Sequence, residues 1–382
     1  MITLSSFDKK YFNDIWEKID AKMKKVALRS YDKLPYTAKN GVHDNREDLD
    51  WWTNGFWGGM MWILYMQTKD EQYKKTAINA ENILRKVLEE DAINLHHDVG
   101  FMWNITSGVH YRIDGDKKAM NDELLSAFSL ASRFNIKGEF IRAWNTGNGD
   151  SDNTGWAIID CMMNIPLLYR ASEITGDDRF IHIAKAHADK TMENHIRADG
   201  SVKHIVEYNP KNGEFVKEYG GQGYSEGSSW SRGQAWALYG FALAYIHFGD
   251  KKYLDTTKKV ANYFISCVSA QEEYLTLCDF RSPKEPVIYD STAACCAACG
   301  LVEIANCVEE HEKELYLNAA VKLLKAITDK FVDFSEETDP LVLCGTEAYS
   351  RGHHIPIIYG DYFYIEAVYK LINEKKTDML MW

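Results

Sequence analysis

The fold is decided by the stretch Trp236-Ala-Leu-Tyr-Gly-Phe-Ala-Leu-Ala-Tyr-Ile-His-Phe248-Gly249-Asp250-Lys-Lys-Tyr253. Its residues up to Phe248 are almost all apolar, which predicts a buried helix. Gly249 then provides a helix C-cap, and Asp250 supplies an anion in the first turn of a second helix, where the helix dipole favours negative charge. From Tyr253 onward, apolar residues recur with helical spacing on one face only. The stretch therefore predicts an αα-hairpin with one buried and one amphipathic helix.

The same junction recurs along the chain. Close copies are Gly176-Asp177-Asp178-Arg179-Phe180 and Lys69-Asp70-Glu71-Gln72-Tyr73, and weaker copies begin at Gly115 and Glu312. A repeat of this kind is the signature of a helical-hairpin array. The pattern predicts about twelve helices, near residues 6–29, 51–67, 70–89, 98–114, 116–134, 155–175, 177–196, 230–248, 250–268, 290–309, 312–331 and 359–374. Strand signals are weak and confined to loops such as 200–216.

Six such hairpins are expected to close into a ring. In each, the helix that is apolar all round belongs inside and its amphipathic partner outside. We therefore predict an all-α fold, an (α/α)6 barrel, in a single catalytic domain that spans residues 1–382. Length alone suggests roughly two or three domains, but the continuous repeat outweighs it. An open solenoid is the alternative, and it would need polar caps at its ends, which the sequence does not show.

Charge and composition narrow the class of function. The net charge of −12 leaves no basic stripe to neutralise phosphates, so no nucleic-acid partner is expected. A single sugar carboxylate needs only one or two local cations and stays compatible with this charge. Aromatic residues make up 13% of the chain, with 11 Trp and 22 Tyr. Such an excess often lines a carbohydrate site, and the alternative is an aromatic-rich helical core.

The expected setting is the cytoplasm. Residues 1–10 lack the apolar core and cleavage site of a signal peptide, and the most apolar stretch, around residues 56–66, is too short to span a membrane. Of the eight cysteines, Cys295, Cys296 and Cys299 cluster in an Ala-rich helical run without a second pair or a histidine at zinc-finger spacing. We expect small buried thiols of a reduced protein, and no membrane partner.

Polar and aromatic residues gather where the six inner helices begin. These starts contain Asp50-Trp51-Trp52, His97-Asp98, Gly155-Trp156, Trp230-Ser231-Arg232, Tyr289-Asp290 and Tyr359-Gly360-Asp361. In an α/α ring these helix ends share one rim. One such start would be ordinary N-capping, whereas six that carry indoles or phenols and ionisable groups predict a pocket.

Asp160 and Asp98 are the candidate catalytic carboxylates. Asp160 is expected a little inside its helix, between Ile159 and Cys161, where a charged group is costly without a partner. It is interpreted as a proton donor with a raised pKa, and the alternative is a structural Asp bonded to a loop or an arginine. Asp98 alone is more typical of an N-cap. If it lies near Asp160, like-charge repulsion helps to keep one of the pair protonated near neutral pH.

Other polar candidates carry weaker signals. Arg232, between two tryptophans, is interpreted as a bidentate clamp on a substrate carboxylate, with a salt bridge at the rim of the core as the alternative. His204 and Gln222 lie on loops. Residues 150–155 resemble the opening of a calcium loop, but its twelfth position is Cys161 rather than Glu. We predict no metal ion and no cofactor.

Taken together, four motifs resemble the unsaturated glucuronyl hydrolases of glycoside hydrolase family 88. The motifs are His96-His97-Asp98-x-Gly100-Phe101, Ile158-Ile159-Asp160-Cys161-x-x-Asn164, Trp230-x-Arg232-Gly233-Gln234-Ala235-Trp236 and Gly360-Asp361-Tyr362, and they follow the family order over about residues 45–367. The resemblance implies an (α/α)6 barrel, in agreement with the helix count. It also implies a substrate made by a polysaccharide lyase, a glycosaminoglycan oligosaccharide that ends in 4,5-unsaturated glucuronic acid.

The resemblance further implies roles for single residues. The position of Asp160 is the family's general acid/base, which protonates C4 of the enol ether and deprotonates the water that adds at C5. The hemiketal then opens and releases the remaining sugar. The position of Asp98 is a second essential carboxylate. Residues implied around the unsaturated sugar are Trp52, Phe56, His97, His204, Gln222, Trp230, Arg232 and Trp236. Trp52 or Trp236 is expected to stack on the ring, and Arg232 to contact the substrate carboxylate.

Alternatives come from two other groups. Related hydrolases that act on unsaturated rhamnogalacturonan fragments keep an Asp160-like residue, but the His-His-Asp motif at residues 96–98 argues against them. A non-catalytic carbohydrate-binding α/α toroid would not need both carboxylates, and a sugar epimerase would need a facing histidine pair. Residues 345–352 match the family poorly, and some members use this region to accept or reject a sulfate on the neighbouring sugar. Sulfation preference and oligomeric state stay open.

Overall fold

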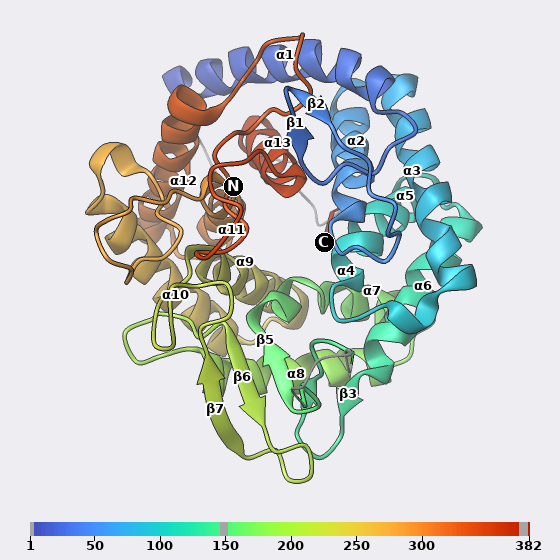
Figure 1. Cartoon of the computed structure of the whole chain (residues 1–382), viewed down its shortest axis with the longest axis vertical. Helices are drawn as coiled ribbons and strands as arrows, with labels where there is room; N and C mark the ends of the chain where they lie inside the picture. Colours follow the sequence, from blue (N-terminus) through green and yellow to red (C-terminus); the bar gives the residue numbers. More distant parts are fainter. Residues whose placement is uncertain (1–3, 146–151, 374–380) are drawn as a thin grey trace.

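The computed structural model describes residues 4–145, 152–373 and 381–382, and its helices form two concentric rings (Figure 1). The outer ring consists of α1 (Ser6–Arg29), α3 (Glu71–Glu90), α6 (Lys117–Ser132), α8 (Arg179–His195), α10 (Lys251–Ser269) and α12 (Glu310–Phe331). The inner ring consists of α2 (Asn54–Thr68), α4 (Val99–Trp103) with α5 (Val109–Asp114), α7 (Pro166–Thr175), α9 (Ser231–Phe248), α11 (Ser291–Cys307) and α13 (Ile358–Ile372). A π-helical turn at Asn104–Gly108 joins α4 to α5.

The hairpin junctions form as the sequence predicts. Gly249 adopts a left-handed conformation with φ of 68°, and the Asp250 side chain accepts a hydrogen bond from the Lys252 backbone N–H. Asp70 and Asp116 cap α3 and α6 in the same way. Inner helices such as α9 are buried on all sides over most of their length, whereas α10 buries one face. The apolar pattern thus sorts the helices into the two rings.

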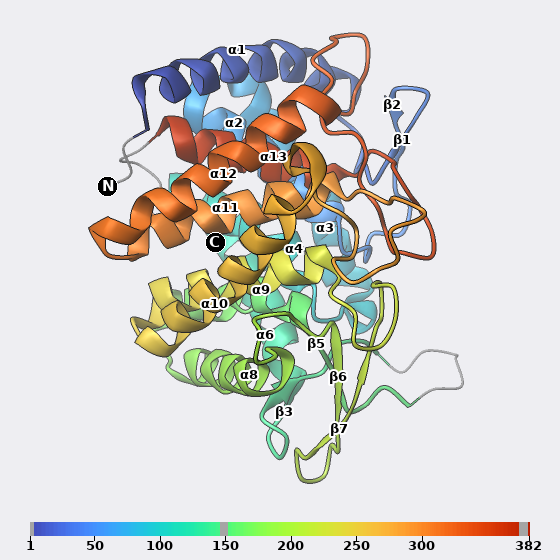
Figure 2. The same cartoon turned by 90° about the vertical axis from the view of Figure 1, so that its left-hand side faces the viewer.

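The inner ring is closed. Helix α13 contacts both α2 and α11, and α1 contacts α13 and α3, so the last hairpin joins the first. Figure 2 shows α1, α12, α10 and α8 in succession along the outside of the barrel. The predicted (α/α)6 barrel is confirmed, and the open solenoid is excluded.

The connections at one end of the barrel contain short antiparallel strands. These are β1 (Ala38–Lys39) with β2 (Val42–His43), β3 (Phe134–Asn135) with β4 (Phe140–Ile141), and a three-stranded sheet of β5 (Trp156–Ile158), β6 (Ile205–Tyr208) and β7 (Phe215–Tyr219). In Figure 2, β1, β2, β6 and β7 lie on the same side of the helices.

One predicted helix differs in a way that matters for the site. The sequence predicts a helix over 155–175, but its first part is β5, followed by a 3-10 helix at Ile159–Met163, and α7 begins only at Pro166. Two physical causes act together. Strand β5 pairs with β6, which is far away in the sequence, and proline favours the first turn of a helix because it has no N–H to donate.

The main hydrophobic core contains residues from Leu4 to Trp382, and a second small cluster consists of Phe140, Ala157, Val206 and Tyr208. Trp382 is 2% exposed and stacks on Phe363 inside the inner ring, and its carbonyl oxygen accepts hydrogen bonds from Arg170. Among the residues that the structure describes, no helix combines the length and apolar character needed to cross a bilayer.

Candidate active site

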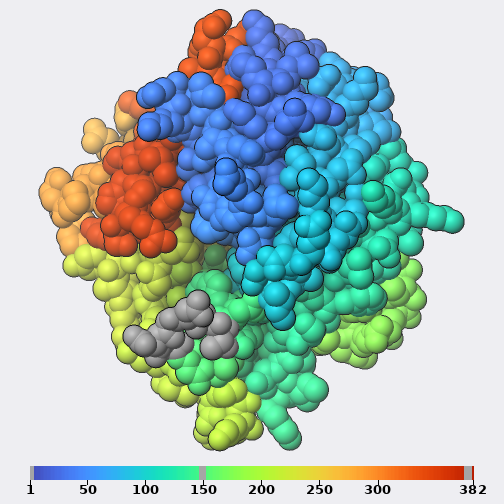
Figure 3. All heavy atoms as spheres, turned by 45° about the vertical axis from the view of Figure 1, so that its right-hand side comes forward, coloured from blue at the N-terminus to red at the C-terminus, as the bar shows by residue number. Residues whose placement is uncertain are grey.

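A cavity of about 310 Å³ opens at the end of the barrel where the inner helices begin. Its lining residues are Tyr36, Trp51, Trp52, His96, His97, Asp98, Trp144, Ile158, Asp160, Gln222, Glu347, Arg351 and Tyr359. Loops from the two ends of the chain meet here, since the Tyr36 hydroxyl donates to Glu347 Oε1 at 2.6 Å and Thr37 pairs with Ile357. Figure 3 shows these blue and red segments side by side on one face. The predicted pocket therefore exists at the rim.

The β5–β6 pairing positions Asp160. The backbone N–H of Ile159 donates to the His204 carbonyl oxygen at 3.0 Å, so the residue after β5 lies beside the residue before β6. As a result, His204 Nε2 is 3.5 Å from Asp160 Oδ2. Asp160 is 7% exposed and lies in a 3-10 helix, not inside a longer α-helix as predicted. The strand-to-helix corner directs its carboxyl group toward the cavity.

Asp98 is held close to Asp160 by a shared amide. Asn164 Nδ2 donates to Asp98 Oδ1 at 3.1 Å and to the Asp160 carbonyl oxygen at 3.0 Å, while Asn164 Oδ1 accepts the Phe101 backbone N–H at 2.8 Å. Gly100 allows this approach, because a Cβ atom there would lie 2.6 Å from the Asn164 Cα. The glycine and asparagine of the two motifs thus bring the two aspartates to one site.

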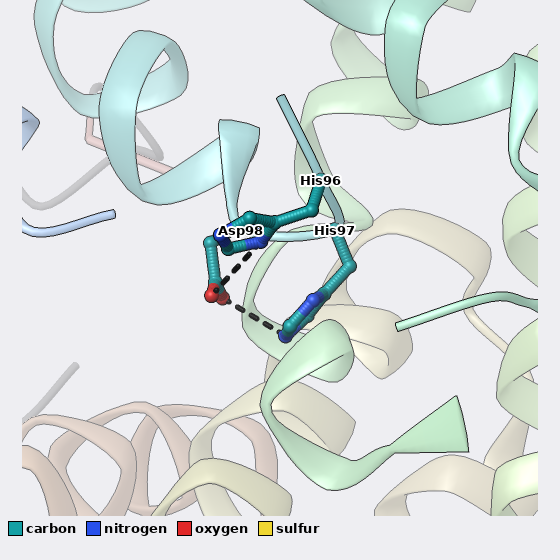
Figure 4. Close-up of side chains that lie close together, drawn as sticks. All are labelled: His96, His97 and Asp98. Atoms are coloured by element: carbon teal, nitrogen blue, oxygen red, sulfur yellow. Dashed lines mark hydrogen bonds and ion pairs between the residues drawn. The ribbon is translucent and has the colours of Figure 1, made fainter. Parts of the chain in front are cut away.

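Two histidines flank Asp98 (Figure 4). His97 Nε2 is 3.2 Å from Asp98 Oδ1, and His96 Nδ1 is 3.5 Å from Asp98 Oδ2. His97 is 1% exposed, and its Nδ1 contacts the Ala143 carbonyl oxygen at 2.8 Å. The backbone after β4 therefore fixes the orientation of the His97 ring against Asp98.

The electrostatics of the pair agree with the expected coupling. Burial and then the nearby Asp160 charge raise the pKa of Asp98 well above its usual range. Burial and then the neighbouring His96 lower the pKa of His97 well below its usual range. The sequence predicts a raised pKa at Asp160, whereas the structure provides the clearest cause for one at Asp98. In such a pair, the protonated carboxyl group can donate a proton and the ionised carboxylate can accept one.

The predicted sugar-binding residues fall into two layers. Trp52, His97 and Gln222 line the cavity together with the two aspartates. Trp52 stacks on Tyr359 with ring centroids 5.2 Å apart, which forms an aromatic wall. Three predicted aromatic residues are buried behind this wall, namely Phe56, Trp230 and Trp236. Phe56 packs on Trp52, Trp236 on Phe101 and Trp230 on His204. Of the two tryptophans expected to stack on sugar, only Trp52 lines the cavity.

Arg232 lies in a buried ion pair, and its predicted contact with the substrate stays a prediction. Its guanidinium donates to Asp290 Oδ2 at 2.5 Å and to the carbonyl oxygens of Thr346 and Glu347 at 2.6 Å each. The side chain is 1% exposed and lies beneath the Tyr359 ring, outside the cavity lining. The structure therefore favours the alternative, a salt bridge at the rim of the core, over the clamp on a substrate carboxylate.

Several lining residues have no strong signal in the sequence. Trp51 and Tyr359 belong to helix starts that the sequence marks as part of a rim, and Arg351 lies in the segment that matches the family poorly. Tyr36 and Trp144 lie on loops without a motif, and only the folded chain brings them to the cavity.

The absence of a metal ion stays a prediction. Donor atoms of His96, His97 and Asp98 lie within 4.8 Å of one another, the one such group found in the described part of the chain. His97 Nδ1 contacts the Ala143 carbonyl oxygen and His97 Nε2 faces Asp98 Oδ1, an arrangement suited to hydrogen bonding without an ion. Of the calcium-like segment, residues 150 and 151 lie outside the described residues.

An α/α barrel with coupled carboxyl groups and an aromatic wall at its rim is the arrangement of a glycoside hydrolase. The sequence profile of Glycosyl Hydrolase Family 88 matches residues 22–381. The chain belongs to this family.

Relatives with known names agree with this membership. The unsaturated glucuronyl hydrolase of Bacillus sp. (strain GL1) is 35% identical over 351 residues, which cover 89% of this chain and 91% of that protein. The unsaturated chondroitin disaccharide hydrolase of Streptococcus agalactiae serotype III (strain NEM316) is 33% identical, with 87% and 83% covered. The crystal structure of the Bacillus enzyme, described as responsible for the degradation of glycosaminoglycan, matches with a TM-score of 0.87 at 32% identity and covers 94% of this chain and 97% of that one.

Proposed function

We propose that this protein removes the 4,5-unsaturated glucuronic acid from the non-reducing end of glycosaminoglycan oligosaccharides produced by lyases. The observation that carries the proposal is the pair Asp98 and Asp160 in one cavity, where burial and the second carboxylate raise the pKa of Asp98. The names of the two relatives point to the same substrate class. A purely binding site would gain nothing from a buried carboxyl group poised to exchange a proton.

The chemistry proceeds by hydration, with Asp160 as general acid and base. A proton from Asp160 adds to C4 of the enol ether, and positive charge develops on C5 and the ring oxygen. Water adds to C5 and returns a proton to Asp160. The C5 hemiketal opens to a ketone, the C1 hemiacetal collapses, and the remaining sugar leaves with its oxygen protonated. Because C1 is not displaced directly, the separation of the carboxylates does not predict retention or inversion.

The aromatic wall and the polar residues of the cavity bind different parts of the substrate. Trp52 offers an apolar face for the unsaturated ring, next to Gln222 and His97. Arg351 also lines the cavity, and its side chain is 74% exposed and 3.4 Å from Glu347. We assign to Arg351 a contact with an anionic group on the neighbouring sugar, since a guanidinium pairs well with a carboxylate or sulfate.

The Arg351→Ala variant tests this contact. We expect KM for a sulfated unsaturated disaccharide to rise about tenfold, the loss of one partly exposed charged hydrogen bond. The change for the unsulfated disaccharide should be small, and kcat should stay near the wild-type value. Steady-state kinetics on the two matched substrates measure the difference. An equal change on both substrates would remove Arg351 from sulfate recognition.

An ultraviolet assay tests the function itself. Purified protein is mixed with lyase-generated unsaturated disaccharides from chondroitin, hyaluronan and heparin, because the conjugated enol carboxylate absorbs and its hydration product does not. We expect loss of absorbance on at least one of these substrates. Activity on unsaturated rhamnogalacturonan fragments alone would assign the chain to that alternative reaction. No loss of absorbance with any of these substrates would favour a carbohydrate-binding protein.

The cellular setting is part of the proposal. All eight cysteines are free thiols. Burial favours the neutral thiol in each, since it raises the pKa of Cys161, Cys267, Cys278, Cys295, Cys296, Cys299, Cys307 and Cys344. This supports a reducing compartment such as the cytoplasm. We further propose a single domain over residues 1–382, on the ground of the main hydrophobic core, and a reaction that needs no metal or cofactor.

A further inference from the structure

Each aspartate of the site faces a histidine ring whose other nitrogen is bound to the backbone. His97 faces Asp98, and His204 faces Asp160. In a neutral imidazole one ring nitrogen carries hydrogen and the other a lone pair. A backbone contact at one nitrogen therefore determines what the other nitrogen presents to the carboxyl group.

His97 presents a lone pair to Asp98. Its Nδ1 lies 2.8 Å from the Ala143 carbonyl oxygen, which can only accept, so Nδ1 carries the hydrogen. The Nε2 atom is buried, receives no hydrogen bond from the part of the chain that the structure describes, and lies 3.2 Å from Asp98 Oδ1. Two acceptors at this distance repel unless one hydrogen lies between them. Because both groups are buried, the neutral arrangement places this hydrogen on Asp98.

His204 presents a hydrogen to Asp160. Its Nδ1 accepts the Gln222 backbone N–H at 3.0 Å, so Nδ1 holds the lone pair and Nε2 carries the hydrogen. That hydrogen points toward Asp160 Oδ2, 3.5 Å away, and neither atom has another hydrogen-bond partner among the described residues. Gly221 makes the contact possible: its φ is +57°, and a Cβ atom there would lie 2.0 Å from His204 Nδ1.

We propose that His97 and His204 are positioning residues whose opposite tautomers keep the proton of the carboxyl pair on Asp98 and leave Asp160 ionised before substrate binds. This inference rests on the proposed function and adds the starting positions of its protons. When the anionic sugar enters, Asp160 takes up a proton from solvent, because a second negative charge beside it favours its protonated form, and it delivers this proton to C4. His204 stabilises the carboxylate that remains after the transfer.

The surrounding charges are compatible with a protonated Asp98 beside an ionised Asp160. Around Asp98 lie His96 on its own segment, Arg133 after α6, and Asp160 and Cys161 from the 3-10 helix. Around Asp160 lie His204, Asp98, Cys161 and, from α9, the buried cation Arg232. Arg232 favours the ionised form of Asp160, whereas at Asp98 burial and the Asp160 charge outweigh the opposing Arg133 cation and raise the pKa.

Infrared difference spectroscopy on the unliganded protein at neutral pH locates the proton. We expect the Asp98→Asn variant to lose one carbonyl band of a protonated carboxyl group, and Asp160→Asn to keep that band. Other buried carboxyl groups cancel in the difference. The protein is treated with a chelator and its metal content is measured. A band lost in Asp160→Asn but not in Asp98→Asn, no lost band in either, or a metal ion bound in the His97–Asp98 contact would overturn the proposal.

The pH profile of kcat/KM tests the role of His204, because it reports the ionisation of the free enzyme. The His204→Phe variant keeps a ring against Trp230 but removes the N–H that stabilises ionised Asp160. Ionised Asp160 is then less stable, so the acidic limb of the profile, where Asp160 takes up a proton, should move up by about one pH unit. The His204→Gln variant, which retains a donor, should restore much of the wild-type limb.

A purely structural role for His204 would lower the rate at every pH without moving the limb, and that result would overturn the proposal. The infrared experiment does not depend on turnover. If the wild-type protein hydrates no unsaturated sugar, the proposed function fails while the infrared bands still decide where the proton lies.

Discussion

The Asp160→Asn variant is expected to lose about 10²–10⁴-fold in kcat, the range attributed to a positioned general acid/base. Asparagine has the shape of the aspartate side chain but cannot give a proton to C4 or take one from water. The fold should be unaffected, because the Asp160 carboxyl group makes no hydrogen bond within the described protein beyond its contact with His204. Affinity for the unsaturated disaccharide should stay within a few-fold of wild type. Ultraviolet kinetics and calorimetric binding measure the two quantities.

A matched control is Asp250→Asn. The change in chemistry is the same, but Asp250 caps α10 far from the cavity, and asparagine serves equally well as an N-cap. This control should keep full activity. A near-wild-type rate for Asp160→Asn would move the acid role to another group in the cavity, with Asp98 the first to test.

Most of the fold is predictable because its signals are local. The glycine and aspartate at residues 249 and 250 are adjacent, and the apolar spacing after them lies within a single helix. The predicted bounds of α1, 6–29, match the observed Ser6–Arg29, and the other outer helices agree within a few residues. Helix 155–175 is the exception. Its first residues become β5 because they pair with β6, and a partner almost fifty residues away leaves no trace in helical spacing.

The site is predictable in part for the same reason. Asp98 and Asp160 stand in motifs at element starts, and Asn164 and Gly100 of those motifs bring them together. Trp144 reaches the cavity only through tertiary structure. Which tryptophan faces the sugar is also undetermined by the sequence. Trp52 and Trp236 both lie near the start of an inner helix, and only packing shows that Trp236 lies beneath Phe101.

For Arg232, the role predicted from the sequence differs most from the environment found in the structure. A cation between two tryptophans is typical both of a substrate clamp and of a buried ion pair, and composition does not separate them. The structure does, because the guanidinium is already bonded to Asp290 and to the backbone of the segment that contains Glu347 and Arg351. Arg232 thus anchors one wall of the cavity from behind.

The Arg232→Ala variant is therefore expected to lose about 3–5 kcal/mol of unfolding free energy, since Asp290 is left buried and unpaired. Asp290 is 0% exposed, so water cannot replace the guanidinium without opening the core. Urea unfolding measures the loss. The surface pair Arg179–Asp177 provides the comparison: its side chains are 67% and 41% exposed, and Arg179→Ala should cost at most about 1 kcal/mol.

The double variant Arg232→Met with Asp290→Leu separates the two interpretations of this arginine. Removal of both charges eliminates the unpaired carboxylate, so the double variant should recover much of the stability lost by Arg232→Ala. A clamp predicts the opposite pattern, with wild-type stability in Arg232→Ala and a raised KM for the anionic sugar that the second substitution does not relieve. Since the anchored segment also holds Arg351, a lost anchor should raise KM only together with lost stability.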